Sequence, residues 1–422
     1  MDRGENAPMT SKHPEEHPTR VWPAEGDCRA PYWIYTDPAI YRRELERIFE
    51  GPTWSYVALE CEIPHPGDYK RGSIGEKSVL IVRGEGGEVN GFLNRCAHRG
   101  VQLCQDESGH VREFMCPYHQ WTYDLSGRLR GLPFLRGVKG QGGMPQDFEL
   151  SDHGLTPIRI HVRRGAVFAT LHEATPPFED YLGEKILAFY DRVFDGRQLK
   201  LLGYSRQRLA ANWKVMIENI RDTCHASLLH VFFVTFGLFR ADQPSKVRMD
   251  DEGFHAALIS ERGRQELTDA TRQIRSFKAD LKLQDPRLLD TVREFPGDAT
   301  VVMHTIWPNL ILQQQSNTLA TRQIVPRGPS EFDLHWTFFG YADDDEELTR
   351  RRLRQANLMG PGGLVSMDDG EIVARAQEGF RAGPDGASIA EMGGRDYTDS
   401  DHMVTDVALR AFYRGYRKVM GL

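Results

Sequence analysis

Two cysteine–histidine pairs constrain what this chain can fold into more than any other feature. Cys96 and His98 form a C-x-H pair, and Cys116 and His119 form a C-x2-H pair further along. Each pair offers one thiolate and one imidazole, so the possible metal ligands come from two short loops. A site of this kind needs both loops held rigidly side by side, which strands joined by tight turns provide.

Two kinds of metal site use these ligand types. In a Rieske [2Fe–2S] centre, cysteines hold one iron and histidines hold the other. A structural Cys2His2 zinc site is the alternative, but zinc modules usually separate the two types into a C-x2–4-C pair and an H-x3–5-H pair. Because each loop here mixes one cysteine with one histidine, the spacing favours the Rieske centre, with Cys96, His98, Cys116 and His119 as its ligands.

A second candidate metal site lies in residues 212–233, NWKVMIENIRDTCHASLLHVFF, which we expect to be helical. On an ideal helix, His225 and His230 would project about 140° apart. Two ligands of one metal at that spacing require a helix that is distorted or that ends between them. Two imidazoles with a carboxylate from elsewhere form the ligand set of a non-haem Fe(II) oxygenase. Taken alone, the pair also fits two packed or solvated histidines.

Together, the motifs CAHRG, CPYHQW and EN-x2-D-x2-H-x4-H resemble those of the large (alpha) subunits of Rieske non-haem iron aromatic-ring hydroxylating oxygenases. The resemblance covers nearly the whole chain. It is strongest to family members that act on aromatic acids, first the salicylate 5-hydroxylases and then the anthranilate and terephthalate dioxygenases. The segments VKGQGGMPQDF, FGLFRAD, EMGGRDY and YRKVMGL carry this closer likeness. The resemblance implies a [2Fe–2S] Rieske cluster and a mononuclear Fe(II).

The resemblance also implies the third ligand of the mononuclear iron. Residues 363–371, GLVSMDDGE, are similar to the family segment whose second aspartate is that ligand, which is Asp369 here. Asp368 and Glu371 are the rival carboxylates. The plain alternative for all three is the solvated, acidic start of a helix. With Asp369, the expected iron ligands are His225, His230 and Asp369.

Asp222 is expected to act beside the iron without binding it. In the family, the matching carboxylate accepts hydrogen bonds from the iron-ligand histidine (here His225) and from a Rieske histidine (here His119) of the neighbouring subunit. Such a carboxylate fixes the tautomer of a ligand histidine and would bridge electron transfer between subunits. A purely structural acceptor is the alternative. Cys224 departs from the family pattern, which usually has tyrosine there, and a smaller side chain would reshape the space beside the iron.

The substrate pocket is less well defined by the sequence. Asn219 is a candidate because it belongs to the family's EN pair and lies one helical turn before Asp222. Gln314 and Ser366 are weaker candidates, chosen because they lie in segments similar to pocket-lining segments of the family. An aromatic acid needs a partner for its carboxylate, and an arginine or a pair of amide donors would suit. The sequence does not identify that partner.

The residue patterns predict an α+β fold. Residues 1–30 are polar and proline-rich, so we expect a disordered lead-in. Short strands and glycine turns over residues 45–160 predict an all-β Rieske domain, in which 78–82 and 88–94 pair as strands. Residues 31–44 and 161–422 are expected to form the catalytic domain, in which strands precede helices without βαβ alternation. Its clearest elements are strands at 300–306, 310–317, 321–325 and 332–341, and helices at 182–194, 346–359 and 404–420. The resemblance adds that helices cover its antiparallel sheet and that the Rieske domain is inserted in it.

Composition narrows the possible partners and location. The net charge of −7 argues against non-specific nucleic-acid binding. No apolar run approaches the roughly 18 residues of a membrane span, and no apolar signal segment opens the chain, so a cytoplasmic protein without membrane contact is expected. The sequence also lacks a nucleotide-binding fingerprint, so reducing equivalents must come from other proteins.

The expected function is that of a terminal oxygenase component. It would hydroxylate an aromatic acid with O2 and electrons relayed from NAD(P)H by a ferredoxin reductase and a ferredoxin, and the best candidate reaction converts salicylate to gentisate. A ring dioxygenase acting on anthranilate, terephthalate or another benzoate is the alternative. A Rieske electron-transfer protein without oxygenase activity is more remote, because it needs no second metal. The resemblance adds a small beta subunit, in an assembly of three alpha and three beta subunits.

Overall fold

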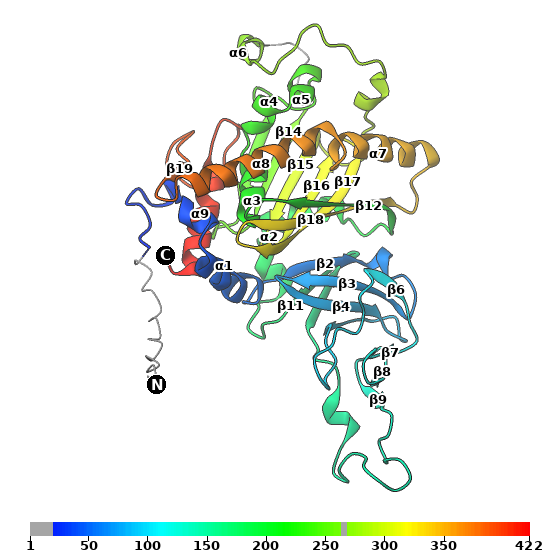
Figure 1. Cartoon of the computed structure of the whole chain (residues 1–422). Helices are drawn as coiled ribbons and strands as arrows, with labels where there is room; N and C mark the ends of the chain where they lie inside the picture. The colour runs from blue at the N-terminus through cyan, green and yellow to red at the C-terminus, as the bar shows by residue number, and fades with distance from the viewer. Residues whose placement is uncertain (1–19, 263–267) are drawn as a thin grey trace, which may run out of the picture.

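The computed structural model describes residues 20–262 and 268–422, which form a small β-rich region stacked beneath a larger region (Figure 1). The larger region contains one long twisted sheet, and helices α7 (Glu346–Met359) and α8 (Leu364–Ala382) cross it. Among the described residues, no helix is long and apolar enough to cross a membrane. The predicted α+β class is confirmed.

The small region is built from three antiparallel sheets, with strand orders β5-β4-β3-β6, β7-β8-β9 and β10-β11-β2. The expected pair of strands at 78–82 and 88–94 is confirmed by β4 and β5, which are joined by a turn in which Gly87 has φ 86°. Glycine suits that turn because other residues are strained at positive φ. The strands are β2 (Ser55–Leu59), β3 (Asp68–Ile74), β4 (Lys77–Arg83), β5 (Val89–Leu93), β6 (Ser108–His110), β7 (Phe114–Met115), β8 (Thr122–Tyr123), β9 (Leu129–Gly131), β10 (Arg159–Arg163) and β11 (Ala166–Thr170).

The large region has a seven-stranded sheet in the order β12-β18-β17-β16-β15-β14-β13, and every neighbouring pair is antiparallel. The four strands expected between residues 300 and 341 are confirmed as β15 to β18. The strands are β12 (Leu199–Leu209), β13 (Ser245–Met249), β14 (Ala256–Glu261), β15 (Ala299–Ile306), β16 (Leu310–Gln315), β17 (Thr318–Gly328) and β18 (Glu331–Tyr341).

Helices cover both faces of this sheet. Helix α2 and strands β2 and β11 of the small region pack on one face, and α1, α3, α8 and α9 bury their apolar residues against the other. The expected helices at 182–194, 346–359 and 404–420 are confirmed as α2, α7 and α9. The remaining elements are α1 (Pro38–Glu44), α2 (Phe178–Val193), α3 (Trp213–Arg221), α4 (His225–Leu229), α5 (Val231–Phe236), α6 (Asp269–Gln273), α9 (Val407–Met420), β1 (Arg29–Pro31), β19 (Ala387–Ile389), the π-helix η3 (Leu45–Phe49) and the 3-10 turns η1 (Gly26–Cys28), η2 (Tyr32–Tyr35), η4 (Glu60–Glu62), η5 (Leu150–His153) and η6 (Pro286–Leu289).

The first described residues differ from the expected lead-in. The disordered segment was expected over residues 1–30, of which 1–19 lie outside the described residues. Residues 20–30 are instead packed: Trp22 is buried in the main core, and β1 pairs with β19 near the C-terminal end. Averaging composition over the polar first thirty residues concealed this short apolar stretch, because a single buried tryptophan contributes much of the packing.

A buried polar network anchors helix α3 to the N-terminal helix α1. Glu44 accepts hydrogen bonds from Trp213 Nε1 at 2.8 Å and from Tyr416 at 2.6 Å, and it pairs with Lys214 Nζ at 2.5 Å. The side chains of Glu44 and Lys214 are fully buried. Helix α3 leads directly into the segment that carries His225, so this network fixes the start of the candidate site.

Candidate metal centre and substrate pocket

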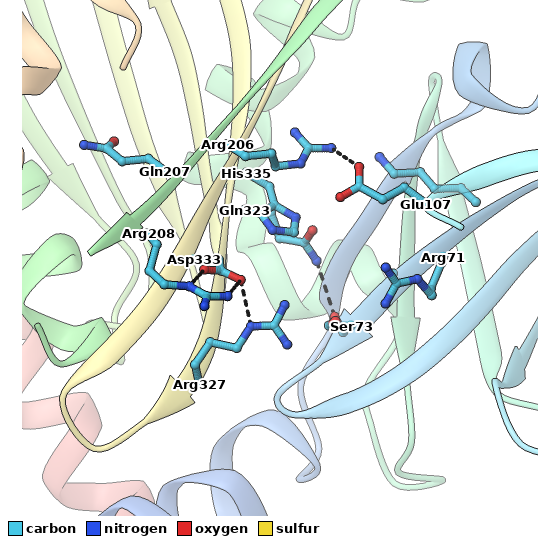
Figure 2. Close-up of a pocket in the computed structure, with 12 residues that line it drawn as sticks. Arg71, Ser73, Glu107, Arg206, Gln207, Arg208, Gln323, Arg327, Asp333 and His335 are labelled. Carbon is cyan, nitrogen blue, oxygen red and sulfur yellow. Dashed lines mark hydrogen bonds and ion pairs between the residues drawn. The ribbon is translucent and has the colours of Figure 1, made fainter. Parts of the chain in front are cut away.

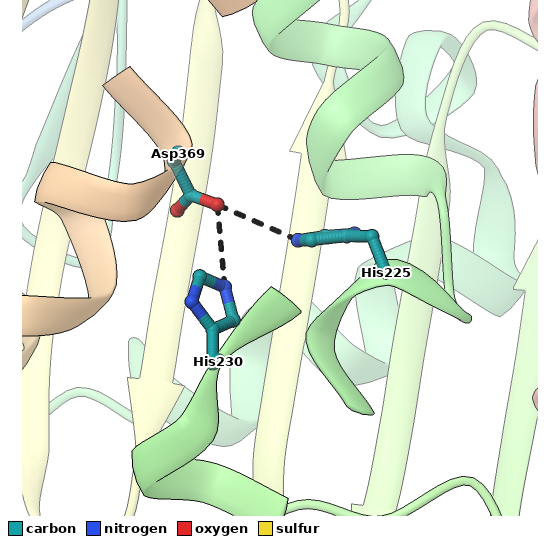
Figure 3. Close-up of side chains that lie close together, drawn as sticks. All are labelled: His225, His230 and Asp369. Carbon is teal, nitrogen blue, oxygen red and sulfur yellow. Dashed lines mark ion pairs between the residues drawn. The ribbon is translucent and has the colours of Figure 1, made fainter. Parts of the chain in front are cut away.

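His225, His230 and Asp369 converge from three elements of the chain (Figure 3). One carboxylate oxygen of Asp369 lies 3.5 Å from His225 Nε2 and 3.3 Å from His230 Nε2. One possible ligand atom from each residue lies within 4.8 Å of the others. The structure therefore brings together the three residues that the sequence suggested as iron ligands.

The break in the helix that the histidine spacing requires is present. Helix α3 ends at Arg221, and α4 begins at His225 and ends before His230. Asp222 and His230 both have extended backbones, with ψ of 101° and 94°. The expected helix over residues 212–233 is thus three short helices, and the turns between them let both imidazoles face Asp369.

Asp368 and Asp369 have different contacts although they are adjacent on α8. Asp369 is 4% exposed and faces both Nε2 atoms. Asp368 lies 3.2 Å from the other ring nitrogen of His230, and its side chain is 41% exposed. Glu371 faces solvent and pairs with Arg375 at 2.6 Å. Of the three acidic residues, Asp369 therefore has the geometry of a metal ligand.

The electrostatics of Asp369 and His225 fit a bound cation. Burial alone would raise the pKa of Asp369, but hydrogen bonds and charge from His225 and His230 outweigh it and lower that pKa. Burial alone would lower the pKa of His225, but its contact with Asp369 raises it. Each group therefore favours the presence of an opposite charge. A divalent cation among these atoms would take the place of the shared protons.

The ring nitrogens that face away from the centre are already engaged. His225 Nδ1 lies 2.6 Å from the main-chain carbonyl of Asp222, and His230 Nδ1 contacts Asp368. Such partners hold a histidine in the tautomer that leaves Nε2 free for a metal. Two imidazoles and one carboxylate are the set that mononuclear Fe(II) oxygenases use. The residues present therefore fit a mononuclear iron.

The contacts of Asp222 differ in part from those expected. Its carboxylate accepts the backbone N–H groups of Cys224 at 2.9 Å and His225 at 3.1 Å, and its main-chain carbonyl, not its carboxylate, meets the His225 ring. The resemblance did not indicate this contact, which arises because a turn directly before His225 brings the carbonyl of Asp222 to the ring.

The Cys224 thiol donates to the carbonyl of Met403 at 3.0 Å, and Cys224 is absent from the described residues that line the pocket.

A narrow pocket of about 60 Å³ opens beside the three residues. Ligand sites usually measure roughly 300–1,000 Å³, so an aromatic ring is admitted only when side chains move. Apolar walls of this kind exclude water and hold a ring by contact. The apolar lining includes Ile220, Phe233, Phe239, Leu258, Val301 and Met303.

Two of the weak pocket candidates lie on the helices around the centre. Asn219 donates from Nδ2 to Asp369 at 3.2 Å, so it contacts the candidate ligand, but it is not among the described residues that line the pocket. Ser366 lies instead on the side of α8 that faces β12, where its hydroxyl donates to Gln207 at 3.4 Å. Val365 reaches the pocket in its place, because it is one helical turn from Asp369.

The third candidate, Gln314, lies on the wrong face of the sheet. It accepts a hydrogen bond from Arg192 at 2.9 Å, away from the pocket. Its neighbour Gln315 lines the pocket, because successive side chains of a strand point to opposite faces. Arg322 also lines the pocket and was missed. The sequence did contain an indication of Arg322, because an arginine stands there among the apolar residues of a central strand.

The loops of the proposed cluster lie at the far end of the small region. Cys96 and Cys116 are each 2% exposed. The rings of His98 and His119 lie 4.6 Å apart between centroids, nearer the surface. Burial is the largest cause that raises the pKa of Cys116, and the neighbouring Cys96 adds to it. The two thiols together and the two imidazoles together fit a cluster whose irons have unlike ligands.

A larger hollow of about 410 Å³ lies elsewhere, between β3 and strands β12, β17 and β18 (Figure 2). Its walls are mainly charged and polar: Arg208 and Arg327 both pair with Asp333 at 2.8 Å. Burial lowers the pKa of His335 to about 3, so that ring is neutral. Such walls offer little apolar surface to an aromatic ring, so the pocket beside His225 is the better substrate site.

Comparison with known families finds a match for each of the two regions. A Rieske [2Fe–2S] domain matches residues 53–141, and the catalytic domain of ring-hydroxylating alpha subunits matches residues 190–422. The crystal structure of naphthalene 1,2-dioxygenase from Rhodococcus sp. superposes with a TM-score of 0.78 at 25% identity, covering 93% of this chain and 94% of that one.

Characterised relatives extend over the same length. The large oxygenase component of salicylate 5-hydroxylase from Ralstonia sp is 52% identical, over 95% of this chain and 96% of its own. The anthranilate 1,2-dioxygenase large subunit of Burkholderia cepacia is 42% identical, over 95% of each chain. A terephthalate 1,2-dioxygenase alpha subunit of Comamonas sp is 40% identical, over 95% of this chain and 97% of its own. The chain therefore belongs to the Rieske ring-hydroxylating oxygenases, as an alpha-type terminal oxygenase that uses a [2Fe–2S] cluster and a mononuclear iron.

Proposed function

We propose that this enzyme hydroxylates an aromatic acid, with salicylate as its substrate and gentisate as its product. The observation that carries an oxygenase function is the buried group of His225, His230 and Asp369 at the end of an apolar pocket. The choice of salicylate rests on the 52% identity to a salicylate 5-hydroxylase component over 95% of the chain. A Rieske carrier that only transfers electrons would have no use for this second group of ligands.

Each residue of the proposed centre has a distinct task. His225, His230 and Asp369 would hold the iron, which when bound supplies the position at which O2 is activated. The carbonyl of Asp222 fixes the ring of His225, and Asp368 fixes that of His230. Asn219 donates to Asp369 and so orients the carboxylate. The apolar walls exclude water and hold the substrate ring in place.

Electrons reach the enzyme through other proteins in this proposal. The sequence has no nucleotide-binding fingerprint, so a ferredoxin reductase would oxidise NAD(P)H and a ferredoxin would deliver single electrons. Cys96, His98, Cys116 and His119 would hold the cluster that receives them. A small beta subunit would complete an assembly of three alpha and three beta subunits.

A reconstituted turnover assay tests the substrate. The purified oxygenase is combined with ferredoxin, reductase and NADH, and offered salicylate, anthranilate, benzoate and terephthalate, with products identified by mass spectrometry. We expect gentisate from salicylate. A catechol or a cis-diol from another acid would replace salicylate with that acid and make the enzyme a dioxygenase. NADH consumption without product from any of the acids would overturn the proposed aromatic-acid substrate.

A further inference from the structure

The hollow of about 410 Å³ between β3 and strands β12, β17 and β18 is a basic cavity to which the proposed oxygenation assigns no task (Figure 2). Its volume falls within the roughly 300–1,000 Å³ that is usual for ligand sites. Five cationic side chains and two carboxylates line it. The cationic residues come from both regions of the molecule: Lys70 and Arg71 from β3, and Arg206, Arg208 and Arg327 from the large sheet.

Arg71 differs from the other cations of this hollow because it has no carboxylate partner. Within the described part of the chain it forms no ion pair, and its side chain makes one long hydrogen bond, of 3.4 Å, from Nε to the main-chain carbonyl of Asp106. Both Nη atoms of Arg71 therefore remain free to donate. The other four cations are paired, as Lys70–Glu62, Arg206–Glu107, Arg208–Asp333, Arg208–Glu331 and Arg327–Asp333.

Arg327, on the opposite wall, also presents free donors. Its Nε pairs with Asp333 at 2.8 Å, and neither Nη atom has a hydrogen-bond partner among the described residues. Asp333 balances Arg327 only in part, because the same carboxylate accepts from Arg208 at 2.8 and 3.2 Å. Figure 2 shows the guanidinium groups of Arg71 and Arg327 on either side of Ser73.

The floor between these two walls is buried and hydrogen-bonded. Gln323, Lys70 and Asp333 line the hollow and are 4%, 8% and 8% exposed. The Nε2 of Gln323 donates to the main-chain carbonyls of Tyr56 at 2.8 Å and Ser73 at 3.3 Å, and so joins the large sheet to strands of the small region. The two walls are thereby held in place, and a preformed site of this kind binds a ligand with little cost of ordering.

We propose that this hollow binds a small oxyanion, a phosphate or a dicarboxylate, that bridges Arg71 and Arg327. A guanidinium donates two parallel hydrogen bonds to the oxygens of a carboxylate or a phosphate. An anion with several charged oxygens can engage both arginines at once, which a chloride ion cannot do. Because Arg71 lies on β3 and Arg327 on β17, the bound oxyanion ties the small β-rich region to the catalytic sheet.

Calorimetry and thermal unfolding of the assembled oxygenase test this inference. Inorganic phosphate, succinate and chloride are compared at equal ionic strength. A ligand that binds only the folded state raises the midpoint of unfolding as its concentration exceeds Kd. We expect phosphate or succinate to bind and to raise the midpoint by a few degrees, and chloride to do neither. The oxyanion that acts identifies the ligand as a phosphate or as a dicarboxylate.

Two variants locate the binding to the two walls. Arg71→Gln should weaken oxyanion binding about 10–100-fold, because hydrogen bonds from a charged donor are lost. Arg327→Gln should weaken it similarly from the other wall. Arg350→Gln is the matched control, because it removes an exposed arginine of α7 that is not among the described residues lining the hollow. This variant should keep the wild-type affinity.

Equal effects of phosphate, succinate and chloride would reflect general screening of charge and would overturn the inference. Wild-type affinity in both Arg71→Gln and Arg327→Gln would overturn it as well, because the anion would then bind elsewhere. If one of these variants folds poorly, the other variant and the wild-type titration still decide. None of these measurements requires turnover, so they do not depend on which aromatic acid the enzyme hydroxylates.

Discussion

Two adjacent aspartates and one peptide carbonyl determine how the histidines of the metal centre are presented. The Asp222 carbonyl and the Asp368 carboxylate each take the Nδ1 atom of one histidine. Both Nε2 atoms are thereby left facing Asp369. The two aspartates on α8 thus have different roles. Asp368 orients the ring of His230, and Asp369 is the candidate ligand that faces both Nε2 atoms. Residue spacing could not distinguish the two carboxylates; the family resemblance assigned the ligand role to Asp369, and the contact of Asp368 with His230 was not anticipated.

Replacing His225 with alanine tests the assignment of the two metal sites. The variant should lose the mononuclear iron and all oxygenation, because two protein ligands remain. Its visible Rieske spectrum should be unchanged, since the cluster would use four other residues. Iron analysis and absorption spectroscopy measure both. His335→Ala is the matched control, because His335 lies in the separate hollow, and it should keep both metals. Loss of the Rieske spectrum in His225→Ala would contradict the assignment.

The direction in which a side chain points limits how well individual site residues can be predicted from the sequence. The two histidine ligands follow from a motif with fixed spacing and Asp369 from the family resemblance, and the structure brings the three together. Gln314 was chosen where Gln315 lines the pocket, because a shift of one residue along a strand reverses the face. Arg322 was missed although it stands among apolar residues, because the sequence alone does not show toward which face of the sheet its side chain points.

Short helices position the site because a buried network holds their starting point. The segment after α3 turns twice within a few residues, at Asp222 and at His230. Such turns need a rigid support, and α3 has one in the pairing of Lys214 with Glu44 of α1. Burial lowers the pKa of Lys214, and Glu44 opposes this shift. Glu44 on α1, far upstream in the chain, thereby holds α3, the helix that leads into the metal centre.

Removing Glu44 should destabilise the packing of α3 against α1. Glu44→Ala leaves the ammonium of Lys214 buried without its partner, which costs about 3–5 kcal/mol. We expect a fall of several degrees in the midpoint of thermal unfolding and weaker binding of the mononuclear iron. Glu371→Ala is the control, because it removes an exposed partner of Arg375 on α8 and should cost under about 1 kcal/mol. Equal stability of the two variants would show that the network does not support the site.

Regular elements with strong apolar patterns were predictable, and irregular ones were not. Strands β15, β16 and β18 match their expected ranges closely, and helix α7 spans its expected range. Strand β17, expected over 321–325, extends three residues further at each end. Strands β13 and β14 and helix α6 lie in the charged stretch between residues 240 and 300, where no strand or helix period stands out. The sequence indicated the turns around α4 only indirectly, because the spacing of His225 and His230 required a break or distortion of the helix.

The two proposed metal sites lie at opposite ends of one molecule. Strands β7 and β8, which flank the loop with Cys116 and His119, lie in the lower part of Figure 1, whereas α4 and α5 lie in the upper part. A direct path between these sites within one chain would cross the whole sheet. We propose instead that electrons pass between neighbouring subunits, from His119 of one chain to Asp222 of the next. Such transfer would suit a ring-shaped assembly.

An Asp222→Asn variant tests that route. Asparagine still accepts the backbone N–H groups of Cys224 and His225, so the turn and both metals should persist. It lacks the negative charge that would hold His119 of the partner subunit, so electron transfer in a single turnover should slow roughly 10–100-fold. Asp37→Asn is the matched control, because this carboxylate also accepts a backbone N–H, that of Ala39 at 2.8 Å at the start of α1, and it is not among the described residues that line the pocket beside the metal centre. Unchanged single-turnover kinetics in Asp222→Asn would mean that Asp222 only caps a turn, and the path between subunits would have to run through other residues.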